Sequence, residues 1–274
     1  MTGARDWQGT VGRSWAAEWR RTDASFAELT PHLLALIATQ PGECIVDVGC
    51  GAGELSIALA DARPNASVVG IDISADLIDA ASARTDLPNL TFEQADATQW
   101  QPRQRPDLYV SRHGVMFFPD PPQAFSHLAR VAAPHARIVF SCFRKAVDNA
   151  WVVGLAELLP AGDVPVAQPF PPGPFAFADP DHVRRCMAGW RDHTFTPVDF
   201  RYVAGQGDDP VGEALALFRR IGPAAPALRD LPQNERSGLE RRLQDLVEAH
   251  LEGGRVVFPA AAWLVTASSD HRNG

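Results

Sequence analysis

The chain has 274 residues, of which 46% are hydrophobic and 21% are charged, and its formal net charge at pH 7 is -8. A chain of this length buries a sizeable core and fits one elaborated domain better than two full ones. The acidic balance argues against a long nucleic acid as the main partner, because phosphate binding needs a basic surface.

Cysteine usage and hydropathy bear on the compartment. The chain has no C-x-x-C pair, no apolar stretch approaching the length of a membrane span, and no secretory pattern at its N-terminus. Free thiols suit a reducing environment. We expect a soluble, cytoplasmic protein, monomeric or homodimeric, with no metal site and no membrane or nucleic-acid partner. Its four cysteines are Cys44, Cys50, Cys142 and Cys186.

Strand and helix patterns alternate along residues 40–143. Such alternation predicts an α/β fold with a doubly wound, mostly parallel sheet. Short apolar runs predict strands at 43–48, 67–72, near 90, near 108 and at 136–143, and helical spacing predicts helices at 54–60, 74–83 and 122–132.

Further elements follow in the C-terminal half. Asp179-Pro180-Asp181 combines an N-cap with a proline at the first helical position, so we expect a helix to begin there. Strand patterns occur at 195–202 and 256–267, and helical spacing between them predicts a helical pair at 213–221 and 235–250.

A glycine-rich turn joins the first strand to the first helix of the alternating region. Residues 47–53 read Asp-Val-Gly-Cys-Gly-Ala-Gly. Glycines at 49, 51 and 53 allow a tight bend and let a ligand lie against peptide groups and the helix N-terminus. Taken alone, this triplet is also compatible with an ordinary strand-to-helix turn.

A second acid favours a nucleotide-like cofactor. Asp72 ends the next strand, roughly 20 residues after Gly49, which is the spacing of a carboxylate that binds ribose hydroxyls. The dinucleotide pattern G-x-G-x-x-G requires glycine at position 54, where this chain has Glu54. The pattern therefore disfavours a nicotinamide cofactor.

Three motifs in order resemble the class I S-adenosylmethionine-dependent methyltransferases. The family's first motif, an acid followed by G-x-G-x-G, is matched by residues 47–53; its second acid is matched by Asp72, and a third motif by Gln94-Ala95-Asp96-Ala97. Residues 107–111 resemble the fourth strand, and 112–118 the segment over the methyl-transfer site. The chain is similar to the small-molecule branch that includes the C-methyltransferases of ubiquinone and menaquinone biosynthesis.

The resemblance implies a cofactor, its ligands and a strand order. The cofactor would be S-adenosylmethionine and its product S-adenosylhomocysteine, on a seven-stranded sheet whose last strand inserts antiparallel between strands five and six. Asp47 and the glycine loop would lie near the methionine portion, Asp72 on the ribose, Ile73 against adenine, Asp96 on the adenine amine and Ser111 near the amino end. The expected cofactor-binding set is Asp47, Gly49, Cys50, Gly51, Gly53, Asp72, Ile73, Asp96, Ala97 and Ser111.

Three segments lie outside this cofactor-binding core within a single expected domain of residues 1–274. Residues 1–24, 145–178 and 207–252 are expected to cover the carboxyl edge of the sheet, where ligands bind in such folds. The first segment places Trp15 and Trp19 four apart on one face of a possible helix, which is either docked on the core or a lid over the cofactor.

Prolines interleaved with phenylalanines between residues 160 and 180 preclude a long helix. The stretch is either a linker or an apolar wall of the substrate pocket, and we favour the wall because such pockets are mainly apolar and aromatic. The expected substrate-binding residues are Trp15, Arg112, Phe117, Phe175 and Phe177.

His113 is the candidate general base. It lies two residues past Ser111, at the carboxyl end of the fourth strand, within reach of an acceptor over the methyl-transfer site. A loop histidine is also commonly a structural group, so both roles remain open.

These observations favour transfer of a methyl group from S-adenosylmethionine to the oxygen, nitrogen or carbon of a small molecule by in-line displacement. Two alternatives remain open. One is a methyltransferase acting on a peptide or protein carboxylate, and the other is a non-methylating protein that binds S-adenosylmethionine.

Overall fold

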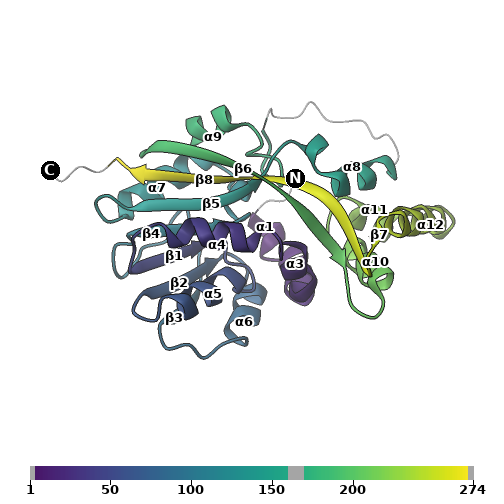
Figure 1. Cartoon of the computed structure of the whole chain (residues 1–274), viewed down its shortest axis with the longest axis horizontal. Helices are drawn as coiled ribbons and strands as arrows, with labels where there is room; N and C mark the ends of the chain where they lie inside the picture. The colour runs from purple at the N-terminus through teal and green to yellow at the C-terminus, as the bar shows by residue number, and fades with distance from the viewer. Residues whose placement is uncertain (1–3, 160–169, 271–274) are drawn as a thin grey trace.

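A mixed sheet organises the computed structural model, which describes residues 4–159 and 170–270 (Figure 1). Its strand order is β3-β2-β1-β4-β5-β8-β6, and the short β7 pairs with β8. The strands are β1 (Cys44–Val48), β2 (Ser67–Asp72), β3 (Leu90–Gln94), β4 (Leu108–Arg112), β5 (Arg137–Phe143), β6 (Trp190–Gly205), β7 (Leu251–Glu252) and β8 (Arg255–Ser269).

Strands β1 to β5 are parallel, whereas β8 runs antiparallel between β5 and β6. The expected doubly wound α/β sheet and its inserted antiparallel strand are therefore confirmed. The buried faces of β1, β4 and β5 explain why their sequences are continuous apolar runs rather than alternating patterns.

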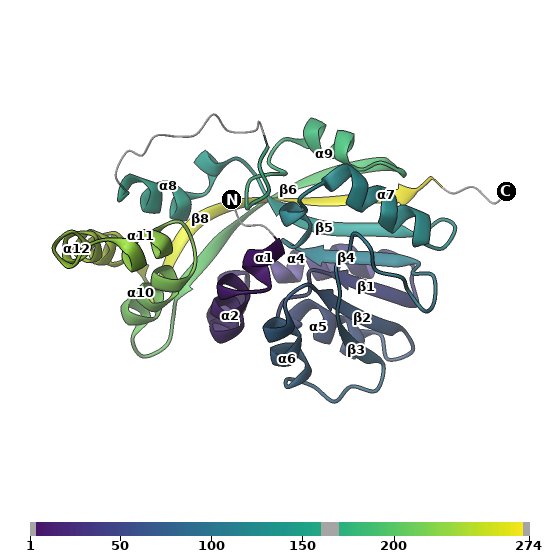
Figure 2. The same cartoon turned by 180° about the vertical axis from the view of Figure 1, so that it is seen from behind.

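Helices pack on both faces of the sheet. Helix α4 lies in front of it in Figure 1, and α7 lies in front of it in the reverse view of Figure 2. Side-chain caps begin three of the helices beside the sheet, with Ser74, Asp120 and Asp179 each accepting a hydrogen bond from a backbone N–H of the first turn. The helices beside the sheet are α4 (Thr30–Ala38), α5 (Glu54–Ala62), α6 (Ala75–Ser82), α7 (Pro121–Val131) and α9 (Pro180–Cys186).

Strands β6 and β8 are much longer than the others and carry a helical cap at one end of the molecule (Figure 1). The expected helical pair is present as α10 and α12, but a third helix, α11, lies between them. Its sequence contains Pro226 and follows Gly222-Pro223, so it lacks a helical signature. The cap helices are α8 (Ala150–Glu157), α10 (Pro210–Arg220), α11 (Ala224–Asp230) and α12 (Gln233–Ala249).

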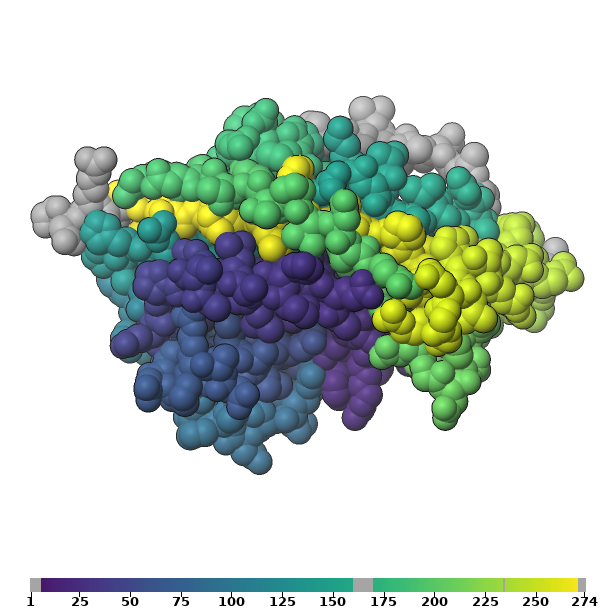
Figure 3. Space-filling model, viewed as in Figure 1, coloured from purple at the N-terminus to yellow at the C-terminus, as the bar shows by residue number. Residues whose placement is uncertain are grey.

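The N-terminal segment is broken into short helices, α1 (Ala4–Trp7), α2 (Thr10–Ala17) and α3 (Trp19–Ser25). The expectation that Trp15 and Trp19 share one helix face is wrong, because Glu18 leaves the helical conformation between them. Figure 2 shows α2 between α6 and the cap, and Figure 3 shows purple N-terminal atoms seated beside the green and yellow cap. The division of the chain into lid, core and cap insertions stays a prediction.

Within residues 4–159 and 170–270, every helix is too short or too polar to cross a membrane. Prolines 160, 165 and 169 of the expected wall or linker lie outside the described residues.

Close packing between β2 and β3 yields a stability prediction. A methyl group on Gly70 would lie 2.6 Å from the Phe92 ring and 2.9 Å from the buried Ser56 Oγ. Overpacking of this kind costs about 1–3 kcal/mol. We expect Gly70→Ala to lower the free energy of unfolding by that amount in urea denaturation.

Gly238→Ala is the matched control. Gly238 lies in α12 and a Cβ there would meet nothing within 4 Å. Alanine in a helix is more stable than glycine by up to about 1 kcal/mol, so this variant should be at least as stable as the parent. Equal stability of Gly70→Ala and the parent would contradict the packing described for β2.

Candidate functional site

A cavity of about 1000 Å³ opens at the carboxyl ends of the parallel strands, between the glycine loop, the N-terminal helices and the cap. Ligand sites typically occupy ~300–1,000 Å³, so this cavity has room for a cofactor and a second small molecule. Its position is the one expected for ligands in doubly wound sheets.

The glycine loop borders this cavity with a backbone that side chains would strain. Gly49, Gly51 and Gly53 have φ angles of 67°, 56° and 84°, all in the left-handed region. A Cβ on Gly49 would meet the Gly114 backbone at 3.0 Å, whereas a Cβ on Gly51 would meet no atom within 4 Å. The loop thus packs tightly at Gly49 and leaves open space at Gly51.

Asp72 lies at the end of β2 and faces the same space. Its carboxylate accepts backbone N–H groups from Gly51 at 3.0 Å and Ser74 at 2.9 Å, which fixes its orientation. Burial raises its pKa, although these hydrogen bonds oppose the shift. Each carboxylate oxygen retains acceptor capacity for a ligand hydroxyl.

Asp47 lies deeper, at the end of β1. Ser56 Oγ donates to Asp47 Oδ2 at 2.6 Å, which joins the strand to α5. Burial raises the pKa of Asp47 to about 6, and the Ser56 hydrogen bond and the Arg112 charge act in the opposite direction. A neighbouring cation of a ligand would favour the ionised form of this carboxylate.

Most of the other expected cofactor residues also line the cavity, namely Cys50, Ile73, Asp96 and Ala97. Asp96 Oδ1 accepts the Thr98 N–H at 2.9 Å and the Thr98 hydroxyl at 2.7 Å, so the acid is held by the turn after β3.

Two expected cofactor residues are placed behind the cavity wall. Gly53 lies against Phe92, where a Cβ would be 2.6 Å from the ring. Ser111 is fully buried, and its hydroxyl donates to Val48 O at 2.7 Å and accepts the Gly114 N–H at 3.2 Å. Both residues shape the loop from behind rather than facing the open space.

His113 lines the cavity with an unusual backbone, because its φ of 61° is in the left-handed region. Nδ1 is 2.8 Å from Ser141 Oγ, while the buried Nε2 has no hydrogen-bond partner. Burial and the nearby Arg112 charge lower the pKa of His113 to about 3. The imidazole is therefore neutral at pH 7, with one nitrogen that forms no hydrogen bond in the structure.

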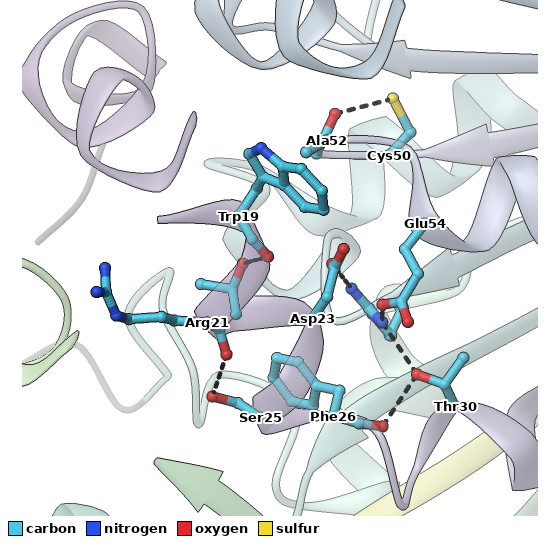
Figure 4. A network of polar contacts seen from close by, with 12 residues as sticks. Trp19, Arg21, Asp23, Ser25, Phe26, Thr30, Cys50, Ala52 and Glu54 are labelled. Carbon is cyan, nitrogen blue, oxygen red and sulfur yellow. Dashed lines mark hydrogen bonds and ion pairs between the residues drawn. The ribbon is translucent and has the colours of Figure 1, made fainter. Parts of the chain in front are cut away.

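Arg112 connects the N-terminal segment to the helix that directly follows the glycine loop. Its guanidinium pairs with Asp23 at 3.1 Å and with Glu54 at the start of α5, and donates to Thr30 Oγ1 at 2.9 Å. Figure 4 shows Asp23, Glu54 and Thr30 converging on this point. Arg112 lines the cavity, as expected of a substrate-binding residue, but its charge is already compensated.

Aromatic side chains seat the N-terminal segment over the cavity. Trp7 contacts Trp15 with ring centroids 5.5 Å apart and Phe117 at 5.0 Å, and all three rings line the cavity. Gly12 of α2 packs so closely that a Cβ would lie 2.3 Å from Ser74 Oγ, beside the Asp72 turn. Buried Glu18 pairs with Arg220 of the cap at 2.7 Å.

The two phenylalanines expected to form a substrate wall are separated in the structure. Phe175 lines the cavity, whereas Phe177 is fully buried among Phe125 and Phe140, with centroids 5.9 and 6.2 Å away. Phe177 packs in the core beside α7 and β5 and does not line the cavity, so the expectation that it forms part of the pocket wall is wrong.

Several cavity residues had no distinguishing sequence signal. They come from the turn after α3, the end of β5, helix α8 and strand β6, and each is an ordinary apolar or aromatic position in its element. The residues are Phe26, Phe143, Trp151 and Tyr202.

Known proteins are similar to part of this chain in sequence and to most of it in fold. Residues 39–161 match the family model described as a methyltransferase domain. Trans-aconitate 2-methyltransferase of Escherichia coli O1:K1 / APEC is 34% identical over 129 residues, which cover 47% of this chain and 48% of that protein. The chain thus spans about half the length of the curated relatives it matches.

Solved structures agree in fold. A magnesium protoporphyrin IX methyltransferase from Synechocystis PCC 6803 with bound SAH superposes with a TM-score of 0.51 at 21% identity, covering 72% of this chain and 92% of that one. A putative methyltransferase from Bacillus halodurans C-125 gives 0.52 at 17% identity, covering 87% and 97%. Residues 39–161 are thus similar in sequence to a methyltransferase domain, and solved methyltransferases share the fold of the chain.

Proposed function

We propose that the protein transfers a methyl group from S-adenosylmethionine to the oxygen, nitrogen or carbon of a small molecule. The observation that carries this proposal is the cavity, in which the open glycine loop, Asp72 and Asp96 face the same space as His113. The candidate cofactor residues and a histidine with an unpaired nitrogen therefore line one cavity.

The cofactor residues would divide the ligand between them. Asp72 would accept the ribose hydroxyls, and Asp96 would accept the adenine amino group through Oδ2, since its contacts with Thr98 end on Oδ1. Ile73 and Ala97 would contact the adenine ring. Asp47 and the backbone at Gly49, Cys50 and Gly51 would hold the methionine portion, with Gly53 and Ser111 supporting the loop.

The bound cofactor supplies an activated methyl group on a sulfonium. The protein's part is to align the acceptor with that methyl and to keep water out of the cavity, which lowers the barrier by prior orientation. The largely aromatic surroundings of His113 would help to exclude water, because the ring centroids of Phe26 and Phe143 lie 4.8 and 4.3 Å from that of His113.

His113 would accept the proton that the acceptor loses. An imidazole with a lowered pKa is a weak base, but the acceptor proton becomes strongly acidic as the methyl adds. The same step would remove the positive charge of the cofactor's sulfonium. The imidazolium of His113 would therefore form as that neighbouring cation disappears. Ser141 would hold the ring through Nδ1.

The N-terminal helices support an enclosed small-molecule site rather than an open peptide groove. Their Trp7 and Trp15 line the cavity, Trp7 packs on Phe117, and the helices are tied to the core by Arg112 and to the cap by Glu18. We propose that this segment is the lid over the cofactor.

We infer that the enzyme works in the cytoplasm, as a monomer or homodimer, without nucleic-acid or membrane partners. The net charge of -8 and the free state of Cys44, Cys50, Cys142 and Cys186 support this inference.

Calorimetric titration with S-adenosylmethionine, S-adenosylhomocysteine and NAD tests the proposal first. We expect both S-adenosyl ligands to bind and NAD not to bind. A screen of small acceptors for S-adenosylhomocysteine release would follow and should include trans-aconitate, the substrate named for the relatives. Binding of NAD alone, or turnover of peptides alone, would refute the proposal.

Replacing Asp72 tests the ribose contact. We expect Asp72→Asn to weaken S-adenosylhomocysteine binding by about tenfold or more, because a charged hydrogen-bond acceptor is lost. Asp79→Asn removes the same charge from the exposed face of α6 and should bind like the parent. Calorimetry measures both, and equal affinities would remove Asp72 from the site.

Replacing His113 tests the proton acceptor. Asparagine tolerates the left-handed backbone at this position. His113→Asn should keep S-adenosylhomocysteine affinity and lower kcat by about 100-fold, a typical general-base effect. His135→Asn is the control, since exposed His135 has a φ of 63°. A kcat above a tenth of the parent value would reject the base role.

The lowered pKa of His113 also predicts a pH profile. The folded protein keeps His113 neutral from pH 7 down to about 3, whereas an unperturbed imidazole would take up its proton near pH 6.5. The imidazole NMR signal of His113 can be assigned as the one that is absent from His113→Asn. In the parent this signal should not shift between about pH 8 and 5. A midpoint in that interval would show that the ring is solvated.

A glycine-to-alanine change tests the lid. A Cβ on Gly12 would lie 2.1 Å from Trp7 O, so Gly12→Ala must displace α1 or α2. We expect S-adenosylhomocysteine affinity to fall by about tenfold, equivalent to roughly 1.4 kcal/mol. Arg13→Ala changes an exposed residue of the same helix and is the control. Unchanged affinity in Gly12→Ala would mean that the segment is docked without contacting the cofactor.

A further inference from the structure

Beyond the glycine loop, part of the cavity is lined by aromatic rings, and we call this part the acceptor chamber. We define this chamber by Phe26, His113, Phe143, Trp151, Phe175 and Tyr202, all of which line the cavity. Phe143 connects its two sides, with centroid distances of 4.3 Å to His113 and 5.6 Å to Trp151. Trp151 is nearly parallel to Tyr202 at 5.2 Å. Flat walls of this kind favour a flat, apolar ligand.

Two residues of the chamber each carry a buried polar atom without a hydrogen-bond partner, namely Nε2 of His113 and Nε1 of Trp151. Their residues are only 5% and 6% exposed, so water does not readily satisfy them. A buried polar atom without a partner is costly, and a ligand that supplies one gains affinity. The indole N–H only donates, so its partner must be an oxygen or nitrogen acceptor.

His113 needs the complementary group. When Nδ1–H donates to Ser141 Oγ, Nε2 presents a lone pair and binds a hydroxyl hydrogen. A ligand that pairs both atoms would therefore have one O–H group that donates to His113 and one oxygen that accepts from Trp151.

The charged residues around the cavity restrict the class of acceptor further. The arginines that line the cavity are all paired: Arg112 with Asp23 and Glu54, Arg220 with Glu18, and Arg229 with Asp230. A polyanionic substrate would have to break these pairs or leave carboxylates against aromatic walls.

We propose that the acceptor is an uncharged, planar hydroxylated aromatic that carries a second oxygen, and that Trp151 is a specificity-determining contact. This inference rests on the proposed methyl transfer. The phenol O–H bond breaks and its proton goes to His113 Nε2, while the phenol oxygen forms a bond to the methyl carbon. The C–S bond breaks, its electron pair stays on sulfur, and the products are an aryl methyl ether and S-adenosylhomocysteine.

The test uses the full chain saturated with S-adenosylhomocysteine and three probes. They are 2,6-dihydroxynaphthalene, the same diol with a carboxylate (3,7-dihydroxy-2-naphthoate), and trans-aconitate. We expect calorimetry to show the neutral diol binding at least about tenfold more tightly than either anion, since an unpaired buried charge costs far more than one such factor. With S-adenosylmethionine, mass spectrometry should show one methyl group added to the diol.

Trp151→Phe keeps the ring and removes the N–H donor. We expect it to weaken diol binding about fivefold, the usual worth of one hydrogen bond, without changing S-adenosylhomocysteine affinity. Trp263→Phe is the control, because Trp263 Nε1 donates to Ala178 O outside the chamber. Thermal melting of both variants verifies that they fold.

The outcomes separate this inference from the function on which it rests. Tighter binding of either anion, or unchanged diol binding in Trp151→Phe, would overturn the inference while leaving methyl transfer intact. Failure of S-adenosylhomocysteine to bind the parent would instead overturn the proposed function itself.

Discussion

The site depends on the close approach of two backbone turns at the ends of β1 and β4. A Cβ on Gly114 would lie 2.6 Å from Val48 O and 3.0 Å from the Gly49 Cα, so neither turn has room for a side chain. Ser111 fastens the turns together, since its hydroxyl donates to Val48 O and accepts the Gly114 N–H. This contact places the glycine loop and His113 beside each other, because His113 directly precedes Gly114. The left-handed backbone of His113 is the local consequence, and packing on both sides sustains it.

A second constraint is the neutralisation of charge around that contact. Asp47, Asp72 and Arg112 are all withdrawn from water, and each is held by fixed donors or acceptors. Arg112 is central because it pairs with Asp23 from the N-terminal segment and Glu54 from α5. Breaking one partner of such a cluster leaves an uncompensated buried charge, which is strongly destabilising. The same cluster therefore stabilises the loop and holds the segment that covers it (Figure 4).

The sequence predicted the parts of this arrangement that local patterns determine. Buried parallel strands read as apolar runs, and the left-handed positions at 49, 51 and 53 need glycine, so the core strands and the loop were identified correctly. The chamber was not predictable in the same way. Trp151 and Tyr202 meet only because α8 and β6 fold over the same strand ends, and nothing in their local sequence marks them. Phe175 and Phe177 show the limit most clearly, because they have one residue between them and yet one lines the cavity and the other is buried in the core.

The charge balance of the reaction connects the cofactor side to the chamber. The cofactor brings one positive charge on sulfur, and the acidic groups Asp47 and Asp72 lie on its side of the cavity. The chamber side holds a neutral imidazole, whose ionisation is opposed by burial and by Arg112. With an uncharged acceptor the cavity would hold one positive charge throughout the reaction, since that charge would pass from sulfur to His113 as the methyl moves onto the acceptor oxygen and the proton leaves it. An anionic acceptor would instead cancel the sulfonium charge in the ground state, and its negative charge would lose the solvation that aromatic walls do not replace. The lowered basicity of His113 and the pairing of the cavity arginines thus both agree with the neutral acceptor proposed above.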